Sequence, residues 1–501
     1  MKLSHKLLDV VSASWIAIGV IIFLLGWCHW YYSIPLTLAT FFCLYEIWKG
    51  GANETLEINH RQLWLSLTVC VTLLWLCGIG GYMVQSNDHY WRNAMFRDLV
   101  NYSWPVYDAQ TGLTKSYYLA FWMLPALVAK LLHSMEAGFF MQLVWLSAGF
   151  ELLFLQISRW MGKVRVSYLF FFYLFAGMKI VECLLYYPVA GGPVLSQTID
   201  ILFTGGTPGV FHAGPIVQFL YDPFNQTIPL FLGMMLMLND TRSRLLPFYY
   251  VSLLLYAPLP LIGLAPVMVY WIVRNLLQMP TALRWRYLLN LENMTTLLLL
   301  VVSALYLMSN NQSGHKGLRD LTDIGLTLYG YVIYIFFEFG IFMLIGYKVC
   351  RDKALLWIGF AIVCLFGWFQ IGLHNDFCFR TNMPFIFMLC LLVIRSYYAS
   401  DSHSRMRKGI LVLYLIGGLP AQGHPALRWL SSACIVMGKD QSVLNNYQHF
   451  KDVKTLYVMQ QKKLRNDELA SSFRCRKDQE QFRTDVGTRN SVFYRYIAKN
   501  I

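Results

Sequence analysis

Long apolar runs constrain the fold of this chain more than any other feature. Eight runs are long enough, or nearly so, to cross a bilayer as helices: 12–31, 33–48, 62–84, 137–157, 168–187, 326–349, 354–371 and 383–399. Shorter or proline-interrupted runs lie at 117–132, 227–239, 245–257, 260–273, 294–308 and 409–420. Because a bilayer offers the backbone no hydrogen-bond partners, such segments are expected to be helices. The pattern predicts an all-α polytopic membrane protein with about 12–13 transmembrane helices.

The composition agrees with a membrane protein. Only 14% of the 501 residues are charged and the mean hydropathy is +0.46, whereas soluble domains carry about 25% charged residues. The net charge of +14 is then explained by lysines and arginines that collect in short cytoplasmic loops. We therefore expect the lipid bilayer as a partner and no nucleic acid.

Basic segments indicate the orientation of the loops. Segments rich in Lys and Arg are expected in the cytoplasm: 49–61, 159–165, 242–244, 274–286, 348–353 and 395–408. The outer face then receives the polar and aromatic loops 85–116, 188–226, 309–325 and 372–382. This alternation leaves no crossing for 117–132, which we expect to be re-entrant or interfacial, with a turn at Pro125. Pro258 and Pro260 predict a turn between two helices.

The chain changes character after Pro420. Residues 421–501 contain fourteen Lys or Arg and seven Asp or Glu, and no run long enough to span a bilayer. We therefore divide the chain into a transmembrane bundle at 1–420 and a small soluble domain of mixed helix and strand at 421–501. Alternation places this domain on the extracytoplasmic side, since long domains are translocated largely regardless of their charge.

The densest polar cluster lies in the first outer loop. Two acids, two arginines and a histidine fall within eleven residues: Asp88, His89, Arg92, Arg97 and Asp98. If 91–103 forms an interfacial helix, its lipid-facing stripe contains Trp91, Phe96, Leu99, Val100 and Trp104. Asp88 then lies near the helix N-terminus, where an ionised carboxylate is stabilised. That position suits a general base or a metal ligand; the alternative is that Asp88 only caps the helix.

Two further clusters lie in later outer loops. Glycines and prolines at 205–212 and 221–226 predict a long irregular loop, in which His212 and Asp222 are candidate substrate contacts. In the next outer loop, His315 and Lys316 are candidates, because a lysine there could hold a phosphate. A structural interpretation stays open for both loops: the first as a loop packed over the bundle, the second as an exposed linker.

The last outer cluster lies between two spans, where unpaired charges are costly. Its candidate substrate-binding residues are His374, Asp376 and Arg380. The planar guanidinium of Arg380 suits a phosphate or diphosphate, because it donates two hydrogen bonds. Alternatively, Asp376 and Arg380 are four residues apart on a helix and simply pair with each other.

Few ionisable residues lie inside the apolar runs: Glu46, Glu151, Lys179, Glu182 and Glu338. Lys179 and Glu182 are three residues apart on one helix face and can neutralise each other. A proton- or ion-coupled transporter usually carries more charge near the middle of the membrane. The pattern therefore argues against a transporter without excluding one.

Taken together, these features resemble the GT-C superfamily of integral-membrane glycosyltransferases, in particular bacterial members of unassigned substrate. Three short segments look like that group's first outer loop: Asp88, Arg97-Asp98-Leu99 and Trp104-Pro105-Val106. Two later segments are also similar: Tyr117-Tyr118 with Pro125-Ala126-Leu127 and Lys130, and Asn375-Asp376-Phe377 with Arg380 and Pro384. The likeness covers most of 60–400, as topology more than as sequence identity. Unlike many relatives, the chain has Asn87-Asp88 in place of paired acids, and two spans precede the loop-bearing span.

The resemblance implies transfer of a sugar from a polyprenyl-phosphate donor to a glycan, lipid or protein acceptor. It places the reaction on the periplasmic or exterior face of a bacterial cytoplasmic membrane. GT-C enzymes generally invert the anomeric centre in one displacement, which would make Asp88 the base, with His89 and Asp98 as further catalytic candidates. Arg92, Arg97 and Arg380 would bind the phosphate. No cofactor is firmly implied, and a divalent cation stays open because the acid pair is missing.

Other classes of protein share parts of this pattern. An envelope polysaccharide polymerase or ligase would also carry arginines in outer loops, acting on a diphosphate-linked glycan. An essential acid in the first outer loop favours a GT-C enzyme, whereas essential arginines in late loops favour the polymerase or ligase. A lipid or solute transporter and a non-catalytic scaffold are further alternatives, since a fold does not determine function.

Overall fold

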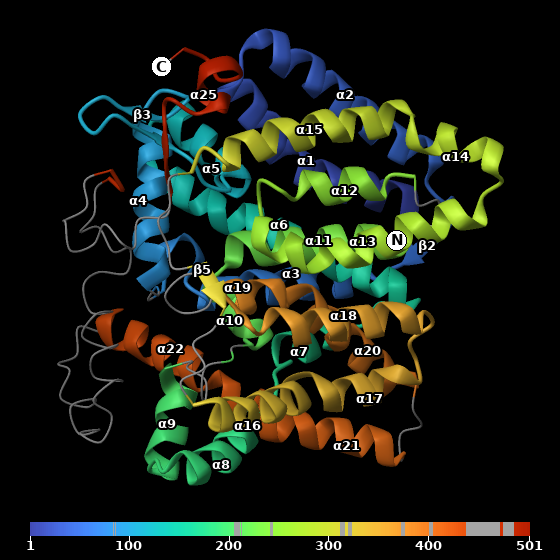
Figure 1. The fold of residues 1–501 in the computed structure, drawn as a ribbon, viewed down its shortest axis with the longest axis vertical. Helices are drawn as coiled ribbons and strands as arrows, with labels where there is room; N and C mark the ends of the chain where they lie inside the picture. Colours follow the sequence, from blue (N-terminus) through green and yellow to red (C-terminus); the bar gives the residue numbers. More distant parts are fainter. Residues whose placement is uncertain are drawn as a thin grey trace.

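The computed structural model describes residues 1–83, 85, 87–204, 211, 213–240, 244–310, 316–318, 323–371, 376–399, 404–436, 471–473 and 485–500. Three predicted site residues, His212, His315 and His374, lie outside this part of the chain. Lys316 is described only as backbone, in the short strand β5 (Lys316–Leu318). Within the described residues the chain is mainly helical and forms one bundle (Figure 1).

Six helical segments of the described chain are long and apolar enough to cross a membrane. They are α1 (His5–Trp27), α6 (Met135–Met161), α13 (Pro258–Gln278), Ile324–Tyr347, Asp376–Ala399 and Arg405–Leu430. A bent pair, α14 (Thr281–Leu288) and α15 (Leu291–Leu307), would make a seventh; its halves meet at 45°. The all-α polytopic class is thus confirmed. The prediction of twelve or thirteen spans was too high by this measure, because several apolar runs form short helices.

Three of the six spanning segments are built from more than one element. Ile324–Tyr347 consists of α16 (Ile324–Ile335), a π-helical turn (Phe336–Gly340) and α17 (Ile341–Tyr347). Asp376–Ala399 consists of α19 (Asp376–Thr381) and α20 (Met383–Ala399). Arg405–Leu430 runs from α21 (Arg405–Leu413) through a second π-helical turn (Tyr414–Gly418) and a 3-10 turn (Pro420–Gln422) into α22 (Gly423–Val436).

The remaining helices are listed here in chain order: α2 (Trp30–Gly50), α3 (His60–Leu76), a 3-10 turn (Ile79–Gly81), α4 (Asn87–Asn101), α5 (Ala120–Leu131), α7 (Ser167–Tyr173), α8 (Lys179–Ala190), α9 (Val194–Thr204), α10 (Ile216–Tyr221), α11 (Phe224–Asn239), α12 (Leu246–Ser252), α18 (Lys353–Phe366) and α25 (Val492–Tyr496). The predicted span 168–187 is wrong as a single helix. It is divided into α7 and α8 by a non-helical stretch at 174–178, most of which is buried.

Helix α5 forms most of the run 117–132 and is too short to cross a membrane by itself. Its 12 residues extend only about 18 Å, whereas the hydrocarbon core is about 30 Å thick. The predicted turn at Pro125 is wrong, because Pro125 lies inside the helix. The chain turns instead after Leu132, where His133 has a φ of 50°. The predicted turn at Pro258 is confirmed: α13 begins there, and proline suits the first helical position because its missing N–H would be unpaired anyway.

Elements that flank the predicted basic and polar loops lie at opposite ends of the described bundle. Figure 1 shows α14 and the strand β2 (Thr55–Glu57) at one end, and α4, α22 and α25 at the other. Ion pairs join the basic segments at the first end: Arg244 with Glu292 at 2.6 Å, and Arg274 with Asp352. The assignment of these ends to the two sides of a membrane stays a prediction.

The last described residues of the chain pack directly on the bundle. Strand β7 (Val486–Thr488) pairs antiparallel with β4 (Leu113–Lys115), which also pairs with β3 (Tyr107–Asp108). The ring of Phe493 in α25 lies 5.1 Å from that of Tyr306 in α15. Two other sheets have two strands each: β1 (Lys2–Ser4) with β2, and β5 with β6 (Phe369–Ile371). The separate tail domain at 421–501 stays a prediction, and its proposed boundary falls within the helical segment Arg405–Leu430.

Candidate functional site

The first turn of α4 carries an exposed acid beside a buried cation. Asp88 and Arg92 are one turn apart, and their side chains form an ion pair at 2.6 Å. The Asp88 side chain is 49% exposed, whereas that of Arg92 is only 5% exposed. An ionised carboxylate is favoured near a helix N-terminus, and the guanidinium adds to this. Asp88 is thus presented to solvent as a carboxylate.

Arg92 connects α4 to the junction of α10 and α11. Its Nη1 donates a hydrogen bond to the backbone oxygen of Asp222, and its guanidinium lies 5.7 Å over the Phe224 ring. The His89 ring stacks on the same phenylalanine at 5.1 Å. The structure therefore brings two predicted clusters together, the one in the first outer loop and the one containing Asp222.

Arg380 of α19 enters the same region from the late outer loop. Its Nη1 donates to the Tyr118 hydroxyl at 2.6 Å, and Gln226 Nε2 donates to that hydroxyl at 3.1 Å. The Tyr117 ring stacks on Tyr118 at 3.7 Å. Arg380 also pairs with the half-exposed Asp376 at 3.5 Å. Tyr118 is therefore a common partner for residues from the second and last predicted clusters, and Arg380 lies close enough to Arg92 of the first cluster for their charges to interact.

Several buried polar atoms around Tyr118 lack a partner among the described residues. They are Arg380 Nε and Gln226 Oε1; the amide of Asn225, which precedes Gln226 in α11, is also buried without a partner among those residues. Buried polar groups almost always have hydrogen-bond partners, from the protein, ordered water or a ligand. We call the group formed by Asp88, Arg92, Tyr118, Gln226, Asp376 and Arg380 the two-arginine site. Its buried atoms have hydrogen-bonding capacity left for a polar ligand.

His89 does not act as a third cation beside Arg92 and Arg380. It is fully buried, and burial together with the charges of Arg92 and Arg428 holds its pKa well below the usual value. The imidazole is therefore neutral near pH 7. The structure places it against Phe224, so its role as a helper of Asp88 stays a prediction.

Arg428 of α22 is a buried cation that the sequence reasoning missed. Its guanidinium lies 4.6 Å over the ring of Tyr221, whose hydroxyl is 2.6 Å from His424 Nδ1. Tyr221 directly precedes Asp222, so α22 packs behind the two-arginine site. An arginine within an apolar stretch is a sign of a functional or paired charge. Arg428 was overlooked because it lies after the predicted domain boundary at residue 420.

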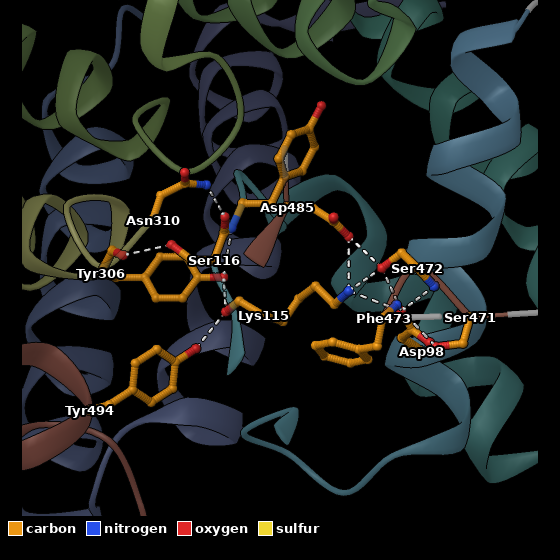
Figure 2. Close-up of polar contacts among 11 residues, drawn as sticks. Asp98, Lys115, Ser116, Tyr306, Asn310, Ser471, Ser472, Phe473, Asp485 and Tyr494 are labelled. Atoms are coloured by element: carbon orange, nitrogen blue, oxygen red, sulfur yellow. Dashed lines mark hydrogen bonds and ion pairs between the residues drawn. The ribbon is translucent and has the colours of Figure 1, made fainter. Parts of the chain in front are cut away.

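Asp98 lies at the other end of α4, about 15 Å along the helix from Asp88. It is 1% exposed and pairs with Lys115 at 2.9 Å. Lys115 also pairs with Asp485 at 2.8 Å, and Ser472 bonds to both acids. Figure 2 shows Lys115 extended between these side chains, with Tyr494 bonded to its backbone oxygen. We call Asp98, Lys115, Ser472 and Asp485 the sealed cluster; it gives Asp98 a structural setting away from Asp88.

The predicted lipid-facing stripe of α4 is wrong. Phe96 and Leu99 are fully buried, and the Phe96 ring packs 5.3 Å from Phe139 of α6. The helix lies against the bundle, so its apolar side chains contact protein. Arg97 is partly exposed on this helix, next to Asp98.

The described residues give no support to a divalent cation. No group of three or more His, Cys, Asp or Glu within them is placed to hold a metal ion. The two exposed carboxylates of the site, Asp88 and Asp376, each face an arginine. This arrangement favours an anionic ligand over a metal ion.

Comparisons with protein-family models, with curated proteins and with solved structures found nothing that matches this chain. Only the geometry of the two-arginine site therefore bears on the function of the chain.

Proposed function

We propose that this protein transfers a sugar from a polyprenyl-phosphate donor to a glycan, lipid or protein acceptor, at the extracytoplasmic face of a bacterial cytoplasmic membrane. The observation that carries the proposal is the convergence of Arg92 and Arg380 beside a half-exposed Asp88. Guanidinium groups bind phosphate oxygens well, because their planar fork matches the phosphate geometry. The GT-C-like arrangement of the outer loops is part of the same proposal.

The donor phosphate would bind at Arg380. Asp376 pairs with Arg380, but that carboxylate is 53% exposed, so the pair contributes little stability. A phosphate can replace it and also use the unpartnered Nε. The neighbouring Tyr118 hydroxyl, already held by Arg380 and Gln226, can donate its proton to a phosphate oxygen.

Asp88 would then act as the base in a single displacement. It takes the proton of the acceptor hydroxyl while the acceptor oxygen forms a bond to the anomeric carbon. The bond between that carbon and the donor phosphate oxygen breaks, and its electron pair leaves with the polyprenyl phosphate. Arg92 and Arg380 stabilise the negative charge that grows on the phosphate. The anomeric configuration is inverted.

An envelope polysaccharide polymerase or ligase is the second candidate. The observation that favours it is the central position of Arg380, which comes from a late outer loop and is buried in the site. In such an enzyme the arginines would bind a diphosphate-linked glycan, and Asp88 would be dispensable. A lipid or solute transporter with a polar vestibule at this end is a third.

The test is Asp88→Asn in the native host, scored by the surface glycan profile and by the level of the protein in the membrane. Because Asp88 is exposed, the variant should fold; transfer should fall by about 10²–10⁴-fold if its carboxylate is the base. Asp352→Asn is the matched control, since Asp352 also pairs with an arginine but lies at the opposite end of the bundle. An unchanged glycan in Asp88→Asn, combined with a lost glycan in Arg380→Lys, would favour the polymerase or ligase.

A further inference from the structure

A buried acid lies near the middle of α6, outside the two-arginine site. Glu151 is 8% exposed, and α6 continues for ten residues beyond it to Met161. Ten residues of helix extend about 15 Å, which is half of the hydrocarbon thickness of about 30 Å. Ionisable groups at this depth are rare and costly, so this acid is a candidate functional group.

The carboxyl group of Glu151 faces α3. Ser66 Oγ lies 2.7 Å from its Oε1, and Cys70 Sγ lies 3.6 Å from its Oε2. Ser66 and Cys70 are fully buried. Because they are four residues apart, they lie on one face of α3, one turn from each other. Each oxygen of the carboxyl group therefore has a partner, one a hydroxyl and the other a thiol.

Glu151 forms no ion pair within the part of the chain that the structure describes. The cation further along α6, Arg159, pairs with Asp9 of α1. It lies eight residues from Glu151, about 12 Å along the helix. A carboxylate buried without a cation costs much more free energy than the neutral acid. Burial therefore favours the protonated form of Glu151.

The hydrogen bonds of Ser66 favour the same form. Its hydroxyl lies 3.0 Å from the backbone oxygen of Leu63 and 2.7 Å from Glu151 Oε1. A carbonyl oxygen and an ionised carboxylate can only accept, whereas a hydroxyl has one hydrogen to donate. A protonated Glu151 donates to Ser66, and Ser66 then donates to Leu63, so each contact has its own hydrogen. With an ionised Glu151 the two contacts would share a single hydrogen.

We propose that Glu151 is a proton-binding site in the middle of the membrane, which holds its proton in a hydrogen bond to Ser66 at the contact between α3 and α6. Cys70 is the titratable side chain that bonds to it, through the second carboxyl oxygen. The proposal does not rest on the proposed glycosyl transfer. It holds for an enzyme and for a transporter.

The test is infrared spectroscopy of the purified full-length protein in lipid nanodiscs at pH 6, in H₂O and in D₂O. A protonated carboxylic acid has a carbonyl stretch that is separate from the bands of carboxylates and amides. Subtraction of the Glu151→Gln spectrum from the wild-type spectrum should leave one such component, which moves to lower frequency in D₂O. Other protonated acids contribute equally to both proteins and cancel.

Two further variants make the assignment specific. Ser66→Ala retains the acid but removes the acceptor of its proton, so the component should remain and move to higher frequency. Glu292→Gln is the matched control. Glu292 is also buried, but it pairs with Arg244 at 2.6 Å and is expected to be ionised, so its loss should leave the carboxylic acid region unchanged.

Three results would overturn the proposal. Identical carboxylic acid regions in the wild type and in Glu151→Gln would mean that Glu151 holds no proton. If Glu151→Gln fails to fold, a carboxylic acid region that is unchanged in Ser66→Ala would lead to the same conclusion. Loss of the component on adding Na⁺ or K⁺ at constant pH, in the wild-type protein, would identify a metal cation as the ligand.

Discussion

The two ends of α4 carry the same kinds of side chain in opposite settings. At the first end Asp88 pairs with Arg92 at 2.6 Å, and the carboxylate is half exposed. At the other end Asp98 pairs with Lys115 at 2.9 Å, and both side chains are buried. Lys115 is further held by Asp485 and Ser472. Burial alone would lower the pKa of Lys115, but the carboxylates of Asp485 and Asp98 raise it above its usual value.

This difference separates a structural ion cluster from a candidate site. In the sealed cluster the lysine has several partners from three segments of the chain, so it holds the last described residues against the first outer loop (Figure 2). In the two-arginine site the acids reach water, and Arg380 retains an unpartnered Nε. Access to solvent and spare hydrogen-bonding capacity, rather than residue type, distinguish the two.

The largest effect is expected from breaking the sealed cluster. Lys115→Met leaves two buried carboxylates without their cation, which costs about 3–5 kcal/mol in the free energy of unfolding. Chemical denaturation in detergent measures this. Lys49→Met is the control: Lys49 is 64% exposed and lies 3.8 Å from Glu46, so its loss costs about 1 kcal/mol or less. Equal effects in the two variants would show that the sealed cluster does not anchor the fold.

The next largest effect is expected on the transfer rate when the two-arginine site is changed. Arg380→Lys retains the charge but loses the planar fork, so the transfer rate should fall by about 10²–10³-fold. Thermal stability should change little, because the charge is kept. Arg395→Lys is the control, since Arg395 stacks on Trp160 at 4.7 Å and lies outside the site. A large loss of stability with transfer intact would place Arg380 with the structural residues.

A smaller effect is expected from His89 on the pH dependence of stability. Burial and two arginines lower the pKa of His89 in the folded protein, while in the unfolded chain it is about 6.5. Below pH 6.5 the unfolded chain takes up a proton that the folded protein does not, so stability falls as pH falls. The slope is at most about 1.4 kcal/mol per pH unit.

Unfolding of the wild type and of His89→Asn between pH 7.5 and 5.5 would measure this contribution. The variant should lose about 1 kcal/mol less than the wild type over that interval. If the free energy of unfolding fell with pH equally in both proteins, His89 would be protonated in the folded state. The two-arginine site would then hold three cations.

The smallest effect is expected from Asp376→Asn. The carboxylate is half exposed and lies 3.5 Å from Arg380, so the pair is worth about 0–1 kcal/mol. Because Asp376 competes with a phosphate for that guanidinium, the KM for the donor should fall by up to about fivefold. Steady-state kinetics with a polyprenyl-phosphate sugar would show it. A large loss of kcat would instead make Asp376 part of the chemistry.

Local patterns in the sequence determined the class of the protein and much of its organisation. Apolar runs located helices such as α1 and α6, and Pro258 marked the start of α13. The helices α14 and α4, which adjoin a predicted basic segment and a predicted outer loop, lie at opposite ends of the bundle (Figure 1). The spacing of four residues also indicated the pair Asp376–Arg380. These features could be predicted because each depends on residues that are close together in the chain.

Only the tertiary structure decided which polar residues meet. Arg380 bonds to Tyr118, 262 residues away in the chain, and Lys115 joins Asp98 to Asp485, which is 370 residues from the lysine. The sequence alone could not assign Asp88 to an open site and Asp98 to a sealed one. Solvent access depends on packing between distant helices, and no local pattern of residues encodes that packing.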